Sequence, residues 1–381
     1  MTESSHFDYI IIGNGLAGLQ LALELSSDAF FNDKQIALID PSEKLENDKT
    51  WSFWETDLSK WNHLTQRKWS KAQVLTSKKS ISLDLSPYSY KTIRAIDFYR
   101  FAKDNLRTKP NFKFFIEEVK DVRESEIISV TTNKTTYTTS HVFDSRIPLE
   151  FQKKDKNTIS IIQHFKGWII KTKAPSFDDE TITMMDYRLK DGAQTTFMYV
   201  LPFSKTEALV EFTYFTENMV DESVYDLHIK QYIQEFLKLS DYTIEETEMG
   251  QIPMTNFAFD DFNTDRITKI GTAGGWVKPS SGYSFKHTEK KIKILIENIK
   301  LGERPSKGLF KNKYKFYDKI FLKVLKDENH KGEWIFERFY DNNSVQTMFR
   351  FLDEESSLLE EIKIMASLFS LSFIKALFKT L

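Results

Sequence analysis

The sequence predicts a mixed α/β protein with an inserted antiparallel sheet and a helical carboxyl-terminal region. Three observations lead to this fold class. Near the amino terminus, a short β-branched strand is followed by a glycine-rich loop and an amphipathic helix. From 159 to about 252, short alternating runs are separated by Pro, Gly and polar residues. After a second glycine-rich segment, apolar residues recur at helical spacing. Strand–helix alternation indicates an α/β domain, and successive short alternating runs indicate an antiparallel sheet.

The composition is that of an ordinary folded protein. Of the 381 residues, 40% are hydrophobic and 28% are charged, and the net charge is −2. The absence of Cys excludes disulfides, thiolate metal sites and thiol nucleophiles, and it fits a reducing compartment. The chain enters a predicted strand at Asp8, which leaves no room for a signal peptide. No apolar run approaches the roughly 18 residues that span a bilayer.

The amino-terminal segment has the order of a Rossmann-type dinucleotide site. A strand over 8–12 leads into a complete G-x-G-x-x-G and a helix, and a second strand over 35–39 ends in Asp40. The loop consists of Gly13, Asn14, Gly15, Leu16, Ala17 and Gly18. Its glycines allow a tight turn, close approach of the pyrophosphate and close helix–strand packing, and the helix N-terminus attracts phosphate. Asp40 is placed to accept hydrogen bonds from ribose hydroxyls.

This motif alone does not distinguish FAD from NAD. Its position at the beginning of a long chain favours FAD, because dehydrogenases that bind only NAD often begin with a catalytic segment. We therefore expect a discontinuous FAD-binding domain over 1–150 and 265–300. The β-rich substrate domain is expected over 151–264 and the helical region over 301–381.

A second glycine-rich segment, 271–285, follows a predicted strand and precedes a helix. Such a segment brings backbone N–H groups to the ribityl and pyrophosphate part of a flavin in many flavoproteins. Gly271, Gly274 and Gly275 are the candidates for this contact. Many of those proteins have Asp where Thr272 stands here, so a backbone or hydroxyl contact would have to replace it.

Two segments are candidates for the substrate pocket. Residues 47–55 combine polar residues with Trp51, Phe53 and Trp54, which indicates a loop that places aromatic rings around a pocket. In a predicted strand over 208–215, side chains alternate between faces, so Glu211, Thr213 and Phe215 share one face. A carboxyl group among aromatics would have a raised pKa and could act as a general acid. The alternative is a Glu on an edge strand that faces water.

Other kinds of chemistry find little support. The chain has no H-E-x-x-H, G-x-S-x-G or P-loop motif, and its seven His residues lack ligand spacing, so no metal site is predicted. The stretch 286–326 contains twelve Lys and one Arg against four acids. It would attract an anionic membrane surface, or it could be a solvated helical face. The usual nucleic-acid-binding motifs are absent, so we expect no nucleic-acid partner.

The last predicted helix, Glu354 to Leu381, has an apolar stripe wider than a simple core face. The stripe could pack on the sheet domain or partly enter a lipid interface.

With these motifs in place, the chain resembles the FAD-dependent lycopene cyclases of bacteria and plants. The matching segments are in family order and span nearly the whole chain: 8–18, 47–54, 144–146, 163–168, 185–188, 201–202, 211–213, 250–254, 271–285 and 351–355. Two departures are mild, namely Lys49 where Arg is commoner and Ser52 where Cys is common.

The resemblance implies a fold similar to p-hydroxybenzoate hydroxylase. It also implies a redox-neutral reaction that closes the ψ-ends of lycopene into β-ionone rings, giving γ-carotene and then β-carotene. The family requires reduced FAD, with NADPH or NADH as reductant, and its essential glutamate corresponds to Glu211. Because a forty-carbon hydrocarbon must be drawn from a bilayer, we expect a peripheral protein on the cytoplasmic side of a membrane, without a transmembrane span.

Two alternatives remain at this stage. A related FAD-dependent oxidoreductase, such as a monooxygenase or a prenyl reductase, would have the same nucleotide site. A non-catalytic flavoprotein that binds carotenoids would have the same fold without the reaction.

Overall fold

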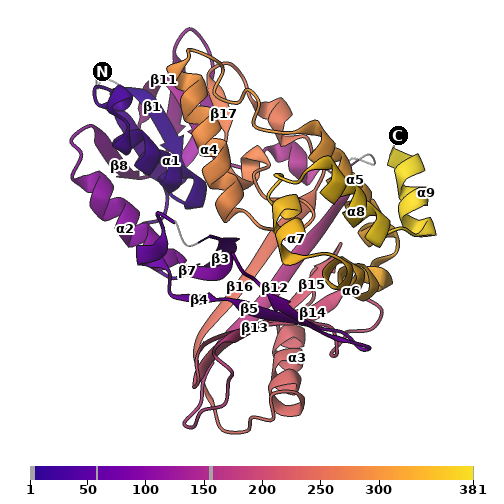
Figure 1. Cartoon of the computed structure of the whole chain (residues 1–381). Coiled ribbons are helices and arrows are strands. Elements are labelled where there is room, and N and C mark those ends of the chain that lie inside the picture. Colours follow the sequence, from indigo (N-terminus) through magenta and orange to yellow (C-terminus); the bar gives the residue numbers. More distant parts are fainter. Residues whose placement is uncertain (1–4, 57–58, 154–157, 381) are drawn as a thin grey trace.

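The computed structural model describes residues 5–56, 59–153 and 158–380, and it is mixed α/β with a helical carboxyl-terminal part, as predicted (Figure 1). Its first sheet has the strand order β8-β2-β1-β11-β10-β9, and β17 pairs with β11. β1, β2, β8, β11 and β17 are parallel, whereas β9 and β10 are antiparallel additions. The bounds are β1 His6–Ile12, β2 Ile36–Asp40, β8 Phe112–Ile116, β9 Val119–Arg123, β10 Ile128–Thr132, β11 Thr136–Asp144 and β17 Ile267–Lys269.

Helices cover one face of this sheet because its strands are apolar on both sides. α1 (Leu16–Ser27) packs against α2 (Ala95–Arg107) and α4 (Phe285–Lys300). Leu21 of α1, Phe98 of α2 and Ile292 of α4 are fully buried in one cluster. On the other face, Ile10 and Ile39 pack in a second cluster with residues of β9 and β10. A sheet buried on both faces is typical of α/β domains.

The second sheet has the order β16-β12-β15-β14-β13-β5-β6 and is antiparallel apart from the β13–β5 pair. Its bounds are β5 Lys71–Leu75, β6 Ser80–Asp84, β12 Ser160–Lys171, β13 Thr181–Asp186, β14 Thr196–Ser204, β15 Glu207–Thr216 and β16 Thr243–Thr255. β5 and β6 come from the range expected to belong to the FAD-binding domain. The predicted domain boundaries themselves stay a prediction.

A small third sheet, β3-β7-β4, connects the two larger ones (β3 Thr50–Glu55, β4 Arg67–Trp69, β7 Ser89–Arg94). The loop predicted over 47–55 is therefore wrong in part, because 50–55 forms strand β3. Its register with β7 pairs Trp51 with Ile93 and Trp54 with Tyr90. The sequence pattern misleads because consecutive aromatics on a strand that is covered on both faces do not alternate with polar residues.

The second sheet lies between two groups of helices. α3 (Glu222–Glu235) covers the lower face in Figure 1, where Val210, Phe212 and Tyr214 of β15 pack. The carboxyl-terminal helices lie on the other face: α5 Asn312–Asp327, α6 Gly332–Asn342, α7 Val345–Leu352, α8 Leu358–Ser367 and α9 Leu371–Thr380.

The single helix predicted over 354–381 is instead two helices, α8 and α9, and Leu381 lies outside the described residues. α8 begins with a capping box in which Ser357 and Glu360 exchange hydrogen bonds. It ends at Ser367, and the chain turns before α9 begins at Leu371. The turn lets Ile364, Leu368 and Ala376 all reach the main core cluster.

Candidate active site

An elongated cavity of about 1400 Å³ runs from the glycine-rich loop after β1 to strand β16. Gly13, Gly15, Leu16, Ala17 and Gly18 all line it. Gly13 has a φ of +100°, and a Cβ there would lie 2.0 Å from Oγ of Ser145. A Cβ on Gly18 would lie 2.0 Å from the carbonyl oxygen of Gly13. Nothing lies within 4 Å of the Cβ position of Gly15, so the loop opens at the point where the N-terminus of α1 would meet a pyrophosphate.

Asp40 lies at the end of β2, as predicted, but it does not line this cavity. Its two carboxylate oxygens accept hydrogen bonds from the backbone N–H groups of Asn14, at 2.7 Å, and Ser42, at 2.8 Å. These bonds fix the shape of the loop. A carboxylate oxygen has a second lone pair, so the predicted ribose contact remains a prediction.

The second glycine-rich segment reaches the cavity through Gly271 and Thr272. Gly274 and Gly275 lie outside the lining and instead shape the turn that follows. A Cβ on Gly274 would lie 2.4 Å from the carbonyl oxygen of Lys269, and Gly275 caps the turn with a φ of +68°.

The cavity suits a polar, elongated ligand such as FAD. The indole Nε1–H of Trp276, which lines it, is buried without a hydrogen-bond partner. A buried donor without an acceptor is destabilising, so a ligand that accepts this hydrogen bond would be favoured.

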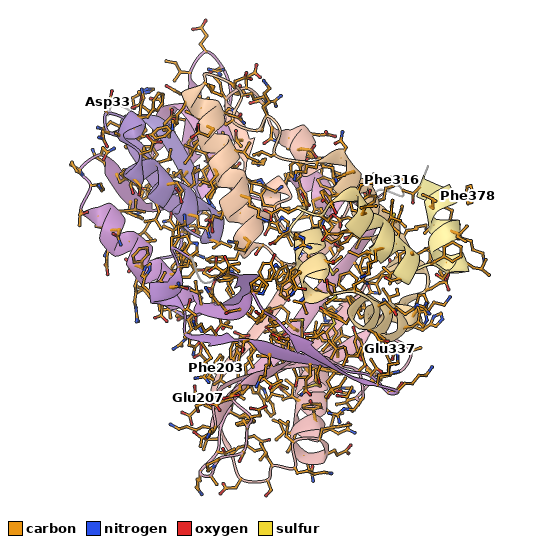
Figure 2. The ribbon with its side chains drawn as sticks, in the orientation of Figure 1. Asp33, Phe203, Glu207, Phe316, Glu337 and Phe378 are labelled. Carbon is orange, nitrogen blue, oxygen red and sulfur yellow. The ribbon has the colours of Figure 1, made fainter. Side chains whose placement is uncertain are left out.

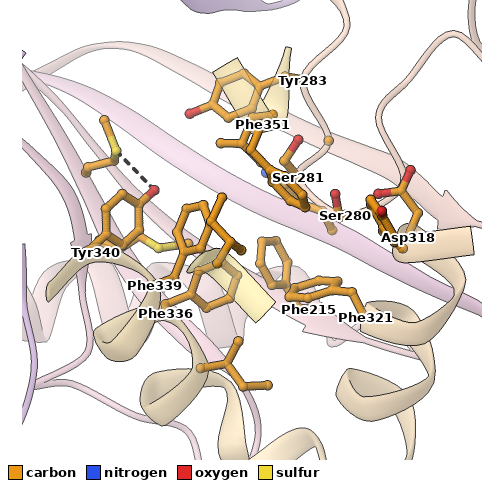
Figure 3. A pocket seen from close by; sticks show the side chains of 18 of the residues that line it. Phe215, Ser280, Ser281, Tyr283, Asp318, Phe321, Phe336, Phe339, Tyr340 and Phe351 are labelled. Atoms are coloured by element: carbon orange, nitrogen blue, oxygen red, sulfur yellow. Dashed lines mark hydrogen bonds between the residues drawn. The ribbon is translucent and has the colours of Figure 1, made fainter. Parts of the chain in front are cut away.

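A second cavity, of about 660 Å³, lies between the second sheet and the carboxyl-terminal helices, and it shares lining residues of β12 and β16 with the first cavity. Aromatic rings dominate its wall, and in Figure 3 those of Phe215, Phe321, Phe336, Phe339 and Tyr340 converge on one space. They come from three elements that are separate in the chain: Phe215 from β15, Phe321 from α5 and the other three from α6. The wall is apolar over most of its area, and Glu211 is the carboxyl group of the second sheet that reaches it.

Glu211 is held at the centre of the second sheet. β15 pairs with β12 on one side and β14 on the other, so the edge-strand alternative does not apply. The predicted alternation is correct: Glu211, Thr213 and Phe215 share the face of the cavity. The Glu211 side chain is 7% exposed, and Oγ1 of Thr213 donates to its Oε1 at 2.7 Å.

Burial and, to a smaller extent, the nearby carboxyl group of Glu248 raise the pKa of Glu211 to about 8, although the hydrogen bond from Thr213 acts to lower it. A group with this pKa holds its proton at neutral pH and can donate it.

Glu248 is a site residue that the sequence prediction missed. It lies on β16, it is 8% exposed, and burial raises its pKa to about 7. It lines the first cavity, and Oγ1 of Thr50 donates to its Oε2 at 3.0 Å. The only available signal was its position two residues before Gly250, inside a stretch of six residues that contains three acids. An acidic stretch ordinarily indicates solvent exposure.

Three tyrosines beside Glu211 form a hydroxyl chain that the sequence also did not reveal. Tyr90 Oη lies 2.8 Å from Tyr199 Oη and 3.0 Å from Tyr283 Oη. Burial raises the pKa of all three phenols well above the usual range, so they remain neutral. They come from β7, β14 and the loop before α4, which are adjacent only in the folded chain.

The comparisons with known proteins agree with this geometry. The profile of the lycopene cyclase protein family matches residues 8–378. This chain belongs to the lycopene cyclase family. No curated protein sequence gives a significant match.

Solved structures show the fold of this family member. It is similar to a geranylgeranyl bacteriochlorophyll reductase-like protein from Thermoplasma acidophilum (TM-score 0.63, 11% identity, covering 99% of this chain and 100% of the other). It is also similar to a flavoprotein/dehydrogenase from Cytophaga hutchinsonii (TM-score 0.61, 14% identity, covering 95% of this chain and 100% of the other). A third similar structure is a probable FAD-dependent monooxygenase from Pseudomonas aeruginosa (0.55, 12%, 92% and 100%). The fold is thus that of the FAD-dependent, hydroxybenzoate-hydroxylase-like flavoproteins, as the resemblance implied.

The predicted pocket walls of this lycopene cyclase family member are only partly in place. Trp51 lines both cavities and Phe215 lines the second. Phe53 and Trp54 lie in the core instead: Phe53 stacks on Phe285 at 4.4 Å between ring centroids, and Trp54 stacks on Phe349 at the same distance. Thr213 is fully buried beneath the cavity wall, where it contacts Glu211.

The lysines of the basic stretch over 286–326 are less free to bind an anionic membrane surface than the charge of the stretch suggests. Each of its twelve lysines has a hydrogen-bond or ion-pair partner. The carboxylate partners belong to Glu55, Glu289, Asp353, Glu355, Asp28, Glu297, Glu303, Glu361, Asp260, Asp327 and Glu217, and Lys291, Lys311 and Lys319 donate to backbone carbonyls.

Helices α8 and α9 and the turn between them carry an exposed apolar patch, which we call the α8–α9 patch. It consists of Leu358, Leu359, Ile362, Met365, Phe369, Leu371 and Phe378, each 43–79% exposed. Phe378 projects outward from α9 (Figure 2). Met365 and Phe369 also line the second cavity, so the patch is continuous with its wall. In the part of the chain that the structure describes, the longest helices fall short of the length and apolar character needed to cross a bilayer.

Proposed function

We propose that this chain is a lycopene β-cyclase. It would close the ψ-ends of lycopene into β-ionone rings by acid catalysis without net redox change, forming γ-carotene and then β-carotene. The observation that carries the proposal is Glu211, a buried carboxyl group with a pKa of about 8 at the wall of an aromatic cavity, in a member of the lycopene cyclase family.

The residues account for the steps of such a reaction. Glu211 donates a proton to the terminal double bond, the tertiary cation is attacked by the neighbouring alkene, and loss of a ring proton sets the final double bond. Water would trap the cation, so the site has to be dry. The apolar wall around Phe215 and Phe336 meets this requirement, and a desolvated aromatic ring stabilises a cation by roughly 0.5–2 kcal/mol.

The first cavity would hold FAD, with its pyrophosphate at Gly13–Gly18 and its other end near Gly271 and Trp51. When bound and reduced, with NADPH or NADH as the reductant, FAD would supply negative charge that favours a nearby cation. Trp51 and Thr50 line both cavities, so they would separate and orient the two ligands.

A lipid surface is the proposed source of the substrate. The α8–α9 patch would enter the membrane interface and place the mouth of the second cavity in the lipid. Because the lysines over 286–326 are paired, apolar burial supports this docking more than charge does.

Expression in a lycopene-accumulating host, with analysis of the carotenoids, tests the reaction, the substrate and the number of rings together. We expect γ-carotene and β-carotene. Unchanged lycopene in a host that holds the folded, flavin-loaded protein would contradict the proposal.

The remaining rivals are an FAD-dependent oxidoreductase and a carotenoid-binding flavoprotein. Lycopene incubated without oxygen with the photoreduced protein separates them. A cyclase converts many equivalents of lycopene while the flavin stays reduced. A monooxygenase needs oxygen, a prenyl reductase oxidises one flavin per product, and a binding protein gives no product.

A further inference from the structure

Glu211 and Glu248 lie in one row across three strands of the second sheet. The register pairs Gly167 of β12 with Glu211 of β15 on one side and with Glu248 of β16 on the other. Directly paired residues in an antiparallel sheet project to the same face. The central position has no side chain, so nothing on β12 separates the two carboxyl groups.

The side chain of Glu211 leans over Gly167. A Cβ at Gly167 would lie 3.3 Å from Cβ and 3.5 Å from Cγ of Glu211, and 2.8 Å from Cδ1 of Leu209. Both carboxyl groups are at least nine-tenths buried, and each faces a different cavity: Glu211 the aromatic one and Glu248 the one proposed for FAD. The row therefore connects the two cavities.

The groups around the row leave its negative charge uncompensated. Glu211 faces Thr213 on its own strand, Tyr199 on β14 and Tyr283 before α4, and these hydroxyls are neutral. On the other side, Glu248 accepts a hydrogen bond from Thr50 on β3.

The charged neighbours of Glu248 are Glu246 on β16 and Arg94 on β7. Nη2 of Arg94 lies 2.7 Å from Oε2 of Glu246, so these two charges offset each other. None of these neighbours therefore supplies a positive charge that would neutralise Glu211 and Glu248. If both carboxyl groups were ionised, they would repel each other strongly.

Building on the proposed function, we propose that Glu211 and Glu248 act as a pair that shares one proton, with Glu248 as the positioning residue that keeps this proton on Glu211. When Glu211 protonates the substrate, the pair is left with two negative charges. It regains one proton when the cyclised cation loses its ring proton. One proton leaves the pair and one returns, so the balance agrees with a redox-neutral reaction.

The test is the pH dependence of lycopene turnover by the reduced holoenzyme with the Glu248→Gln, Glu248→Asp and Glu117→Gln variants. Without the charge of Glu248, the pKa of Glu211 falls, so the alkaline limit of activity should move at least one pH unit lower. Glu248→Asp should return the limit towards the wild-type position. Glu117 is a buried carboxyl group between β8 and β9, held by Thr132 and Tyr137, so its variant should leave the limit unmoved.

An unmoved alkaline limit in Glu248→Gln would overturn the shared proton while leaving the cyclase function intact. If the wild type does not cyclise lycopene, infrared titration of the protonated carboxyl band still tests the pair. Glu248→Gln should then lower the pH at which the band disappears, and an unchanged titration would reject the pair.

Discussion

Glu211 derives its chemistry from its surroundings, so the smallest change to its carboxyl group should be the most informative. Glu211→Gln keeps the size and one hydrogen-bonding oxygen but removes the acidic proton. We expect at least a hundredfold lower turnover of lycopene, since general acid catalysis typically contributes 10²–10⁴-fold. Flavin absorbance measured on the same sample should be unchanged, and activity near the wild-type level would remove Glu211 from the mechanism.

The raised pKa of Glu211 also predicts how the stability depends on pH. A carboxyl group whose folded pKa exceeds its unfolded value contributes stability that is full below the unfolded pKa. This contribution is lost as pH rises towards the folded pKa of about 8. The free energy of unfolding of the wild type should therefore fall, relative to Glu211→Gln, between about pH 5 and pH 8. Chemical unfolding at a series of pH values measures this difference, and parallel curves would contradict the raised pKa.

Gly15 offers a test of the proposed phosphate site that leaves the fold intact. Its φ of −85° suits any residue, and nothing lies within 4 Å of its Cβ position. Gly15→Asp should lose most of the bound flavin because a carboxylate would face the pyrophosphate. Gly15→Ala should keep most of it, and the flavin-free forms of both variants should unfold at similar temperatures. Equal flavin content in the two variants would place the pyrophosphate elsewhere.

For single residues, the sequence pointed to the glycine loop and Glu211, which line the two cavities, but it did not point to Glu248. Gly13 and Gly18 could be predicted because their geometry is local, within one strand–loop–helix unit. Glu248 could not, because its significance depends on a register between strands more than thirty residues apart in the chain. The same reason explains the tyrosine chain.

The inner face of helices α8 and α9 packs in the core, whereas their outer face carries the exposed α8–α9 patch. Replacing Leu371 and Phe378 of the outer face by Ser should weaken binding to neutral phosphatidylcholine vesicles at least tenfold. The basis is that each buried large apolar side chain contributes about 1.5–3 kcal/mol. Leu227→Ser is the matched control, because Leu227 is 63% exposed but lies on α3, on the other face of the second sheet. A flotation assay measures the binding, and equal losses in both variants would reject the patch as the docking surface.

The elements themselves were largely predictable where one periodicity dominates. Strands β1, β2 and β15 lie close to the predicted ranges 8–12, 35–39 and 208–215. Strand β3 and the break between α8 and α9 were not predicted. Both are decided by tertiary packing: β3 is covered on both sides by other elements, and the break lets both helices contribute to one core.

On the scale of the whole molecule, a buried ionic cluster fastens the carboxyl-terminal helices to the rest. Nζ of Lys278, 1% exposed at its side chain, lies 2.8 Å from Asp318 of α5 and 3.1 Å from Glu354 beyond α7. Lys278→Ala would leave the buried Asp318 and the partly buried Glu354 without their partner, and it should lower the free energy of unfolding by about 3–5 kcal/mol. Lys315→Ala, which removes a partly exposed pair with Asp260, should lower it by less than about 1 kcal/mol. Urea unfolding measures both, and equal effects would contradict the role given to Lys278.

The arrangement of the two sheets was beyond local sequence patterns. The sequence indicated a nucleotide-binding domain with an insertion. β5 and β6 belong to the amino-terminal part of the chain, but they pair at the edge of the second sheet. Such a pairing is fixed by long-range packing, on which periodicity carries no information.

The wall common to the two cavities has a thermodynamic consequence. Thr50, Trp51, Phe165, Ile252 and Gly282 line both spaces, so a molecule that orders these side chains on one side also prepares them for the other. If the two ligands are flavin and hydrocarbon, as proposed, reciprocity requires that bound flavin raise the affinity for the hydrocarbon by the same factor by which bound hydrocarbon raises the affinity for the flavin. A membrane rich in substrate would then favour the flavin-loaded protein, and depletion of the substrate would lower the affinity of the protein for the flavin.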